Sequence, residues 1–125
     1  MMRLMGIAMI AWLSIAEGAV PAFAEGDAAR GKSAYQRSCL GCHGDAKTAS
    51  SVGPSLAGLI GRRAGTMAGT PYGRNLYESG IVWDEASLRR YLASPSDEVH
   101  GTIMPIGVSD PVERDDLLAY LKSLK

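Results

Sequence analysis

The five residues from Cys39 to His43, read CLGCH, limit this chain more than any other stretch of its sequence. They contain its only two cysteines, and a histidine directly follows the second one. Two cysteines so close together can form a disulfide, act as a redox pair, hold a metal ion or anchor a cofactor. A disulfide here would close a very small loop and would stabilise the fold little. A thioredoxin-like redox pair needs a strand followed by a helix, and no segment of the sequence shows convincing strand alternation.

A zinc site is also poorly supported, because a structural zinc ion needs four ligands. Besides these residues only His100 is left, and it is alone and distant in the sequence. The remaining interpretation is covalent attachment of haem, for which C-x-x-C-H is the signature. The thiols of Cys39 and Cys42 would bond to the two vinyl groups of the porphyrin. The imidazole of His43 would then point at the iron.

The first 24 residues have the pattern of a cleaved secretory signal peptide. Arg3 gives the positive start, residues 4–16 form an apolar run of 13 residues, and Ala22-Phe23-Ala24 is an A-x-A cleavage pattern. A retained membrane anchor is the alternative, but a helix needs about 20 apolar residues to span a bilayer. We therefore expect a mature periplasmic domain of residues 25–125. Haem attachment outside the cytoplasm agrees with export.

Charge composition argues against nucleic acid as a partner. The chain has 13 basic and 13 acidic residues, and removal of Arg3 and Glu17 with the leader keeps this balance. Phosphate binding relies on an excess of Lys and Arg. The expected mature chain has no second long apolar run, so we expect one soluble domain without stable membrane insertion.

Cap residues and apolar spacing predict an all-α fold with three main helices, one short helix and long loops. Aspartates are good N-caps, and they precede each of the three main segments. A short helix is expected from Pro71 to Tyr77, capped by Thr70. Ser94-Pro95 is expected to end the second main helix and to begin a loop that reaches Ser109. The main helices are expected at residues 28–38, 84–94 and 110–124. Three main helices make a thin core, so a bulky apolar group should fill the middle.

Further motifs, in order along the chain, resemble the class I c-type cytochromes, in particular the mitochondrial-like bacterial soluble monohaem cytochromes c. The resemblance covers residues 26–125. It implies the cytochrome c fold, with long loops wrapped round one covalent haem c. The motifs after CLGCH are Gly53-Pro54-Ser55-Leu56, Gly58-Leu59, Gly61-Arg62, Tyr72, Gly80-Ile81 with Trp83, Leu88 with Tyr91-Leu92, Gly101-Thr102 with Met104, and Glu113-Arg114 with Asp116-Leu117 and Ala119-Tyr120-Leu121.

A second axial ligand decides what a haem iron can do. An open coordination position allows gas or peroxide binding, whereas a position filled by a protein atom suits electron transfer. Outside the leader the candidates are Met67, His100 and Met104. Met104 lies just ahead of the last helix, in a loop that can return a thioether to the haem, and its position matches the axial methionine of the family. We therefore expect His43 and Met104 to be the two iron ligands.

The resemblance also implies roles for residues around the haem. The Pro54 carbonyl would accept a hydrogen bond from the ring of His43 and fix its tautomer. Tyr91 would lie near the Met104 sulfur. Gly31 would let the first helix cross the last one closely, with Tyr35 packed against the last helix. The residues expected near the haem propionates are Arg62, Tyr72, Trp83 and Thr102.

Two departures from the mitochondrial proteins change the expected behaviour. Leu76 replaces a polar residue that helps to hold a buried water, so the pocket should be drier. Ile103 replaces a lysine, and Ser96-Asp97-Glu98 replaces a basic stretch. The lysine ring that the mitochondrial proteins present to acidic partners is therefore largely missing. We expect docking at an apolar haem edge, with weak dependence on salt.

Together these features predict a periplasmic one-electron carrier of a respiratory chain, not an enzyme, and a monomer. It would take an electron from a quinol-oxidising complex or a dehydrogenase and pass it to an oxidase or a similar acceptor. A dedicated cytochrome subunit of one periplasmic dehydrogenase is the nearest alternative. The others are a haem ligand-binding or peroxidatic protein with Met104 displaced, and a thiol oxidoreductase without haem.

Overall fold

The computed structural model describes residues 25–125, so the predicted signal peptide at residues 1–24 lies outside the described residues. The described part forms six helices, and its only extended pairing is an isolated antiparallel bridge between Arg63 and Val82. The predicted all-α class is therefore confirmed. No helix between residues 25 and 125 is long and apolar enough to cross a membrane. The helices are α1 (Ala28–Ser38), α2 (Leu40–His43), α3 (Arg74–Glu78), α4 (Glu85–Ala93), α5 (Pro95–Glu98) and α6 (Pro111–Ser123).

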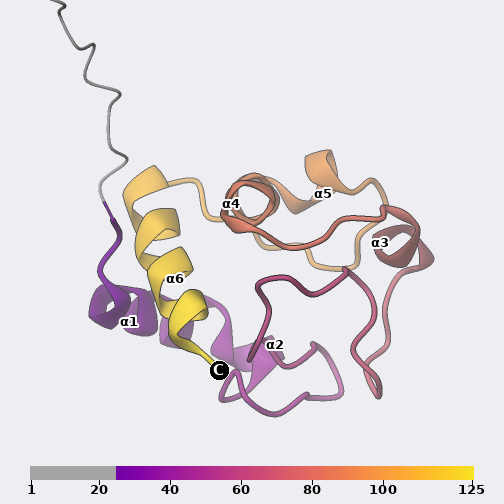
Figure 1. Ribbon diagram of the computed structural model, residues 1–125, viewed down its shortest axis with the longest axis horizontal. Coiled ribbons are helices and arrows are strands. Elements are labelled where there is room, and N and C mark those ends of the chain that lie inside the picture. The colour runs from indigo at the N-terminus through magenta and orange to yellow at the C-terminus, as the bar shows by residue number, and fades with distance from the viewer. Residues whose placement is uncertain (1–24) are drawn as a thin grey trace, which may run out of the picture.

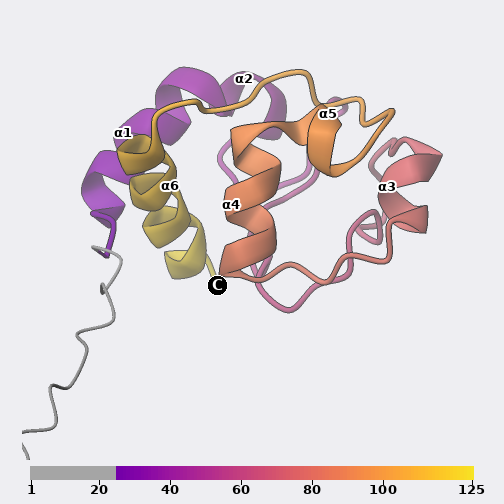
Figure 2. The same ribbon diagram turned by 90° about the horizontal axis from the view of Figure 1, so that it is seen from above.

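Helices α1 and α6 lie side by side at one end of the molecule, and α3 lies at the other (Figures 1 and 2). Helix α4 stands between these two ends and packs against both α6 and α5. The long segment between α2 and α3 runs below α4 in Figure 1. The helices and this segment therefore surround the middle of the molecule from several sides.

Aspartates begin the three longer helices, as predicted. Asp27 and Asp110 accept hydrogen bonds from backbone N–H groups of the first turns of α1 and α6. Asp84 forms a capping box with Ser87 at the start of α4. A carboxylate in this position satisfies N–H groups that have no partner within the helix, and it faces the positive end of the helix dipole.

The short helices correct two predictions. Helix α3 begins at Arg74 rather than Pro71, and no side chain caps it, so the predicted cap at Thr70 is wrong. The backbone at Gly73 is extended, which delays the helix until after Tyr72. Pro95 was expected to begin a loop, but it is the first residue of α5. Proline suits this position because the first N–H of a helix has no partner within the helix.

Gly31 allows α1 and α6 to approach closely, as the resemblance implied. A Cβ atom at Gly31 would lie 1.9 Å from the carbonyl oxygen of Asp116. Tyr35 is buried one turn later, and the centre of its ring lies 5.4 Å from that of Tyr120. Its hydroxyl donates a hydrogen bond of 3.0 Å to the carbonyl of Gly44. Tyr35 therefore connects the α1–α6 crossing to the end of α2.

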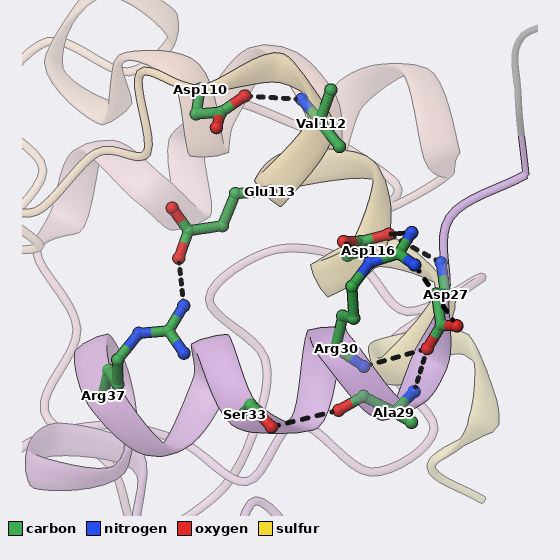
Figure 3. Close-up of polar contacts among 9 residues, drawn as sticks. All are labelled: Asp27, Ala29, Arg30, Ser33, Arg37, Asp110, Val112, Glu113 and Asp116. Atoms are coloured by element: carbon green, nitrogen blue, oxygen red, sulfur yellow. Dashed lines mark hydrogen bonds and ion pairs between the residues drawn. The ribbon is translucent and has the colours of Figure 1, made fainter.

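Polar contacts join both ends of α1 to α6 (Figure 3). The Asp116 carboxylate accepts hydrogen bonds from Nε and Nη2 of Arg30, at 2.8 and 3.0 Å, and from the backbone N–H of Asp27, at 2.7 Å. These bonds, the one from the Arg30 side chain above all, hold the pKa of Asp116 below its ordinary value. At the other end, Arg37 pairs with Glu113 at 2.9 Å.

Candidate haem site

A large cavity lies in the middle of the fold, between α1, α4, α6 and the long loops. The space inside it is about 1270 Å³ with its open mouth included. Most of the wall is apolar, as a flat hydrophobic ring system would require. Its leucines include Leu56, Leu76, Leu88, Leu92, Leu117 and Leu121.

The ten residues that the sequence assigned to haem attachment, iron ligation or the haem surroundings all contribute to the wall of this cavity. Met67 and His100, the other two candidates for the second axial ligand, do not line it. The structure therefore brings together residues from CLGCH, three loops and α4, and it separates Met104 from its competitors. The ten residues are Cys39, Cys42, His43, Pro54, Arg62, Tyr72, Trp83, Tyr91, Thr102 and Met104.

CLGCH consists of Cys39, which joins α1 to α2, and the four residues of α2 itself. The N–H of Cys39 donates to the carbonyl of Tyr35 at 2.8 Å, and the N–H of His43 donates to the carbonyl of Cys39 at 2.9 Å. No disulfide joins the two cysteines. Burial, with smaller effects of Cys42 and Glu113, raises the pKa of Cys39 to about 11. Reactive redox cysteines have a lowered pKa, so the Cys39 thiol does not suit a thiol oxidoreductase.

The ring of His43 is held from behind by the loop that contains Pro54. Its Nδ1 lies 2.9 Å from the Pro54 carbonyl oxygen, so the hydrogen bond implied by the resemblance is present. Because a carbonyl can only accept, Nδ1 carries the proton and Nε2 keeps its lone pair for a metal ion. Gly53 passes close to the same ring, since a Cβ atom there would lie 2.8 Å from Nδ1.

Ser50 is a site residue that sequence reasoning missed. Its hydroxyl donates to the carbonyl oxygen of Cys42 and accepts a hydrogen bond of 3.0 Å from the N–H of Gly53. It therefore ties the end of CLGCH to the loop that orients His43. Ser50 and Ser51 are adjacent, and no feature of the sequence distinguishes one from the other.

Met104 reaches the cavity from the loop between α5 and α6. Close to it, the hydroxyl oxygens of Tyr91 and Thr102 lie 2.6 Å apart and form a hydrogen bond. The resemblance assigned these two side chains to different groups, the methionine sulfur and a propionate, and did not predict that they contact each other. Burial raises the pKa of Tyr91, so its phenol keeps its proton. Leu76 lines the same cavity and offers no polar atom there.

Arg62 brings a half-buried cation to the cavity wall. Its guanidinium donates to the carbonyls of Ala57 and Ser55, at 3.2 and 2.7 Å. Within residues 25–125 it forms no ion pair with a carboxylate, and burial lowers its pKa. An anionic group beside it would relieve this cost of burial. Trp83, whose ring centre lies 5.1 Å from that of Tyr91, also lines the cavity.

These features fit a covalently bound haem. The apolar wall suits the porphyrin, the two thiols suit its vinyl groups, and the free Nε2 of His43 suits its iron. The unpaired cation at Arg62 suits a propionate. The fit comes from the donor set and from the wall of the cavity, and both are built from residues that lie far apart in the sequence.

Comparisons with known proteins agree with this site. The family model described as Cytochrome c matches residues 28–125. Cytochrome c2 of Rhodopila globiformis is 42% identical over 101 residues, which cover 80% of this chain and 95% of the relative. Cytochrome c of Euglena viridis is 39% identical over 101 residues, which cover 80% of this chain and 99% of the relative. The solved structure of cytochrome cH from Methylobacterium extorquens is 42% identical, with a TM-score of 0.71 over 78% of this chain and 99% of that one. The chain therefore belongs to the cytochrome c family, as a class I c-type cytochrome.

Proposed function

We propose that this cytochrome c is a periplasmic one-electron carrier whose single haem c is bonded to Cys39 and Cys42 and ligated by His43 and Met104. Its family makes it a haem-containing electron-transfer protein rather than an enzyme. One observation carries the ligand assignment. His43, oriented by the Pro54 carbonyl, and Met104 line the same cavity from separate segments, whereas Met67 and His100 lie outside it.

When bound, the haem supplies an iron that alternates between the ferrous and ferric states. The two cysteines would hold the ring in place in both states. Pro54 keeps the ring proton of His43 on Nδ1, which leaves Nε2 to face the metal. Met104 offers a soft, neutral thioether, which favours ferrous iron and raises the reduction potential relative to a second histidine. Arg62 would bind a propionate by a charge-assisted hydrogen bond.

A redox titration of the purified haem protein and of M104A tests this assignment. We expect a lower reduction potential in M104A, because loss of the thioether removes the ligand that stabilises ferrous iron. An unchanged potential would show that Met104 is not a ligand. Carbon monoxide separates a carrier from a ligand-binding protein. Rapid and complete binding by the reduced wild-type protein at neutral pH would favour the second function.

Export to the periplasm is supported by the leader pattern, which comprises Arg3, the apolar run and Ala22-Phe23-Ala24. N-terminal sequencing of the protein from an expressing bacterium measures the cleavage site. We expect Glu25 to be the first residue. A haem-loaded product that still begins at Met1 would contradict cleavage.

The partners are proposed to be other redox proteins, with a quinol-oxidising complex or a dehydrogenase as donor and an oxidase or similar protein as acceptor. Exposed apolar side chains at the cavity support docking there, because Val52, Ile103 and Ile106 line it and are 56%, 60% and 45% exposed. The missing lysine ring keeps the alternative of a dedicated dehydrogenase subunit open. Size-exclusion chromatography of the native protein distinguishes them, since a carrier elutes as a monomer and a subunit elutes with its dehydrogenase.

A further inference from the structure

The segment from Ile103 to Gly107, which carries Met104, makes very few hydrogen bonds of its own. Among the described residues, its one bond is a long contact of 3.4 Å between the Met104 N–H and the hydroxyl oxygen of Thr102. A short loop without internal bonds takes its position from whatever holds its two ends. The placement of the Met104 thioether therefore depends on the anchors upstream and downstream of it.

The upstream anchor is formed by α3 and α4. The side-chain amide of Asn75 donates a hydrogen bond to the carbonyl of His100. The Tyr91 hydroxyl contacts that of Thr102 at 2.6 Å, and the Thr102 N–H donates to the carbonyl of Val99 at 3.1 Å. These contacts fix the chain only two residues before Met104.

The downstream anchor is formed by α4 and α6, and its central residue is Arg114. The N–H of Val108 donates to the carbonyl of Leu92 at the end of α4, at 2.6 Å. One nitrogen of Arg114, Nη1, donates to two successive carbonyls, those of Val108 and Ser109, at 2.7 and 2.8 Å. Gly107 passes so close to α4 that a Cβ atom there would lie 2.8 Å from the carbonyl of Ala93.

Among the described residues, the side-chain hydrogen bonds of Arg114 go only to these two carbonyls. Its Nε is buried and has no hydrogen-bond partner, and the side chain forms no ion pair with a carboxylate within residues 25–125. It does not line the cavity, so any effect on the site passes through the loop. The guanidinium is planar and always charged, and its bonds to carbonyls are stronger than those of a neutral donor.

We propose that Arg114 is a positioning residue for Met104. It ties the downstream end of the loop from Ile103 to Gly107 (the ligand loop) to α6, so that the thioether would stay bound to the iron when an outside ligand competes. This inference rests on the proposed ligation by Met104. It goes beyond that proposal by assigning the strength of the axial bond to a side chain of α6 that touches neither the haem site nor Met104.

The test is the binding of imidazole to the ferric, haem-loaded protein, because imidazole must displace the axial methionine. We expect R114Q to bind imidazole about tenfold more tightly than the wild type, which corresponds to the loss of one charge-assisted hydrogen bond. R114K should be intermediate, since it keeps the charge without the planar group. The ferric absorption band that arises from thioether-to-iron charge transfer should be weaker in R114K than in the wild type, and weakest in R114Q.

R37Q is the matched control. Arg37 pairs with Glu113, the residue next to Arg114, but makes no hydrogen bond or ion pair with the ligand loop. R37Q should therefore bind imidazole as the wild type does. The free energy of unfolding is measured for each variant in urea. If Arg114 served the fold alone, R114Q would change this free energy and leave imidazole binding and the absorption band as in R37Q, and that result would overturn the proposal.

M104A separates failure of the inference from failure of the proposed function. If M104A and the wild type have the same imidazole affinity and spectrum, Met104 is not the ligand and both proposals fall. If M104A changes both and R114Q changes neither, only the role of Arg114 is wrong. Should R114Q not load haem, R114K decides, and an imidazole affinity equal to that of the wild type would overturn the inference.

Discussion

At the scale of single residues, Gly53 shows how little space surrounds the proposed iron ligand His43. A Cβ atom at Gly53 would lie 2.8 Å from both Nδ1 of His43 and the carbonyl oxygen of Cys42. We expect G53A to push the His43 ring away from the Pro54 carbonyl, with a cost of about 1–3 kcal/mol in unfolding free energy and an altered reduction potential. Urea unfolding and redox titration of the haem-loaded protein measure the two effects.

Gly41 provides the control, because it lies inside CLGCH and a Cβ atom there would meet nothing within 4 Å. G41A should be neutral or slightly stabilising, since alanine in a helix is favoured over glycine by about 0.5–1 kcal/mol. Equal stability and potential in G53A and G41A would show that the ring of His43 tolerates displacement.

Asp116 makes the stability of the fold depend on pH. The hydrogen bonds from Arg30 and from the Asp27 N–H lower its pKa in the folded protein below the roughly 3.9 of a free aspartate. This stabilisation is complete above the unfolded pKa and is lost as the pH falls through the folded pKa. The gap in unfolding free energy between wild type and D116N should therefore be constant above about pH 5 and narrow below about pH 4.

Urea unfolding at a series of pH values measures this gap. R30Q is the informative control, because it keeps the Asp116 carboxylate and removes the largest cause of its lowered pKa. R30Q should lose less stability than the wild type on acidification, and the loss should end at a higher pH, because the folded pKa of Asp116 then lies closer to the unfolded one. Parallel curves for wild type and D116N across this range would contradict the assignment.

The sequence predicted those site residues whose chemical role few other amino acids can fill. Two thiols and an adjacent imidazole identify Cys39, Cys42 and His43. The motifs that follow them identified seven more residues, and all seven line the same cavity. Contacts made by common residues could not be predicted. Ser50 contacts Cys42 through a hydroxyl, and Arg114 bonds to two carbonyls. Serines and arginines occur throughout the chain, and only the folded structure shows which backbone atom each one reaches.

At the scale of helices, the crossing of α1 and α6 depends on the absence of a side chain at Gly31. A Cβ atom would lie 1.9 Å from the Asp116 carbonyl oxygen, and backbone cannot move aside as a flexible side chain would. G31A should therefore force the helices apart and cost about 3 kcal/mol or more in unfolding free energy. The gain of about 1 kcal/mol in helix propensity is too small to compensate.

Thermal and urea unfolding of the haem-loaded protein check this value. K32A is the control, because it also introduces alanine into α1 but at an exposed position, where a change within about 0.5 kcal/mol is expected. If G31A were as stable as K32A, close approach would not determine how these helices pack.

The longer helices could be predicted because each begins at an aspartate and has an apolar face, signals that belong to the segment itself. Helix α3 could not, because it begins only after Gly73, whose backbone is extended, and Tyr72 just before it lines the cavity. Helix α5 was missed because proline ends one helix and begins another equally well, and the four residues of α5 leave no periodic pattern. Where tertiary contacts set an element, local sequence does not show its bounds.

At the scale of the whole molecule, basic and acidic side chains are balanced in number, and many of them neutralise each other in close pairs. Residues 25–125 keep the balance between basic and acidic side chains. Half of the basic side chains are paired with carboxylates within this part of the chain, namely Arg30, Arg37, Arg74, Arg89, Arg90 and Lys122. Arg62 and Arg63 are the charged residues of the cavity wall, and the haem propionates would offset them. Long-range attraction should therefore contribute little to encounters with partners.

Oxidation of the ferrous protein by ferricyanide, an anion with three charges, measures this steering. Between 10 mM and 0.1 M salt the screening length falls from about 30 to 10 Å, and the wild-type rate should change far less than the roughly tenfold or greater change of a steered reaction.

I103K adds a cation at an exposed apolar residue of the cavity, which should raise the rate at low salt and make it fall steeply as salt is added. S123K adds the same charge at the exposed end of α6, away from the cavity wall, and should behave as the wild type. Equal rates for the two variants would mean that net charge, and not the position of the charge at Ile103, controls access to the haem. A steep salt dependence in the wild type would contradict docking without electrostatic steering.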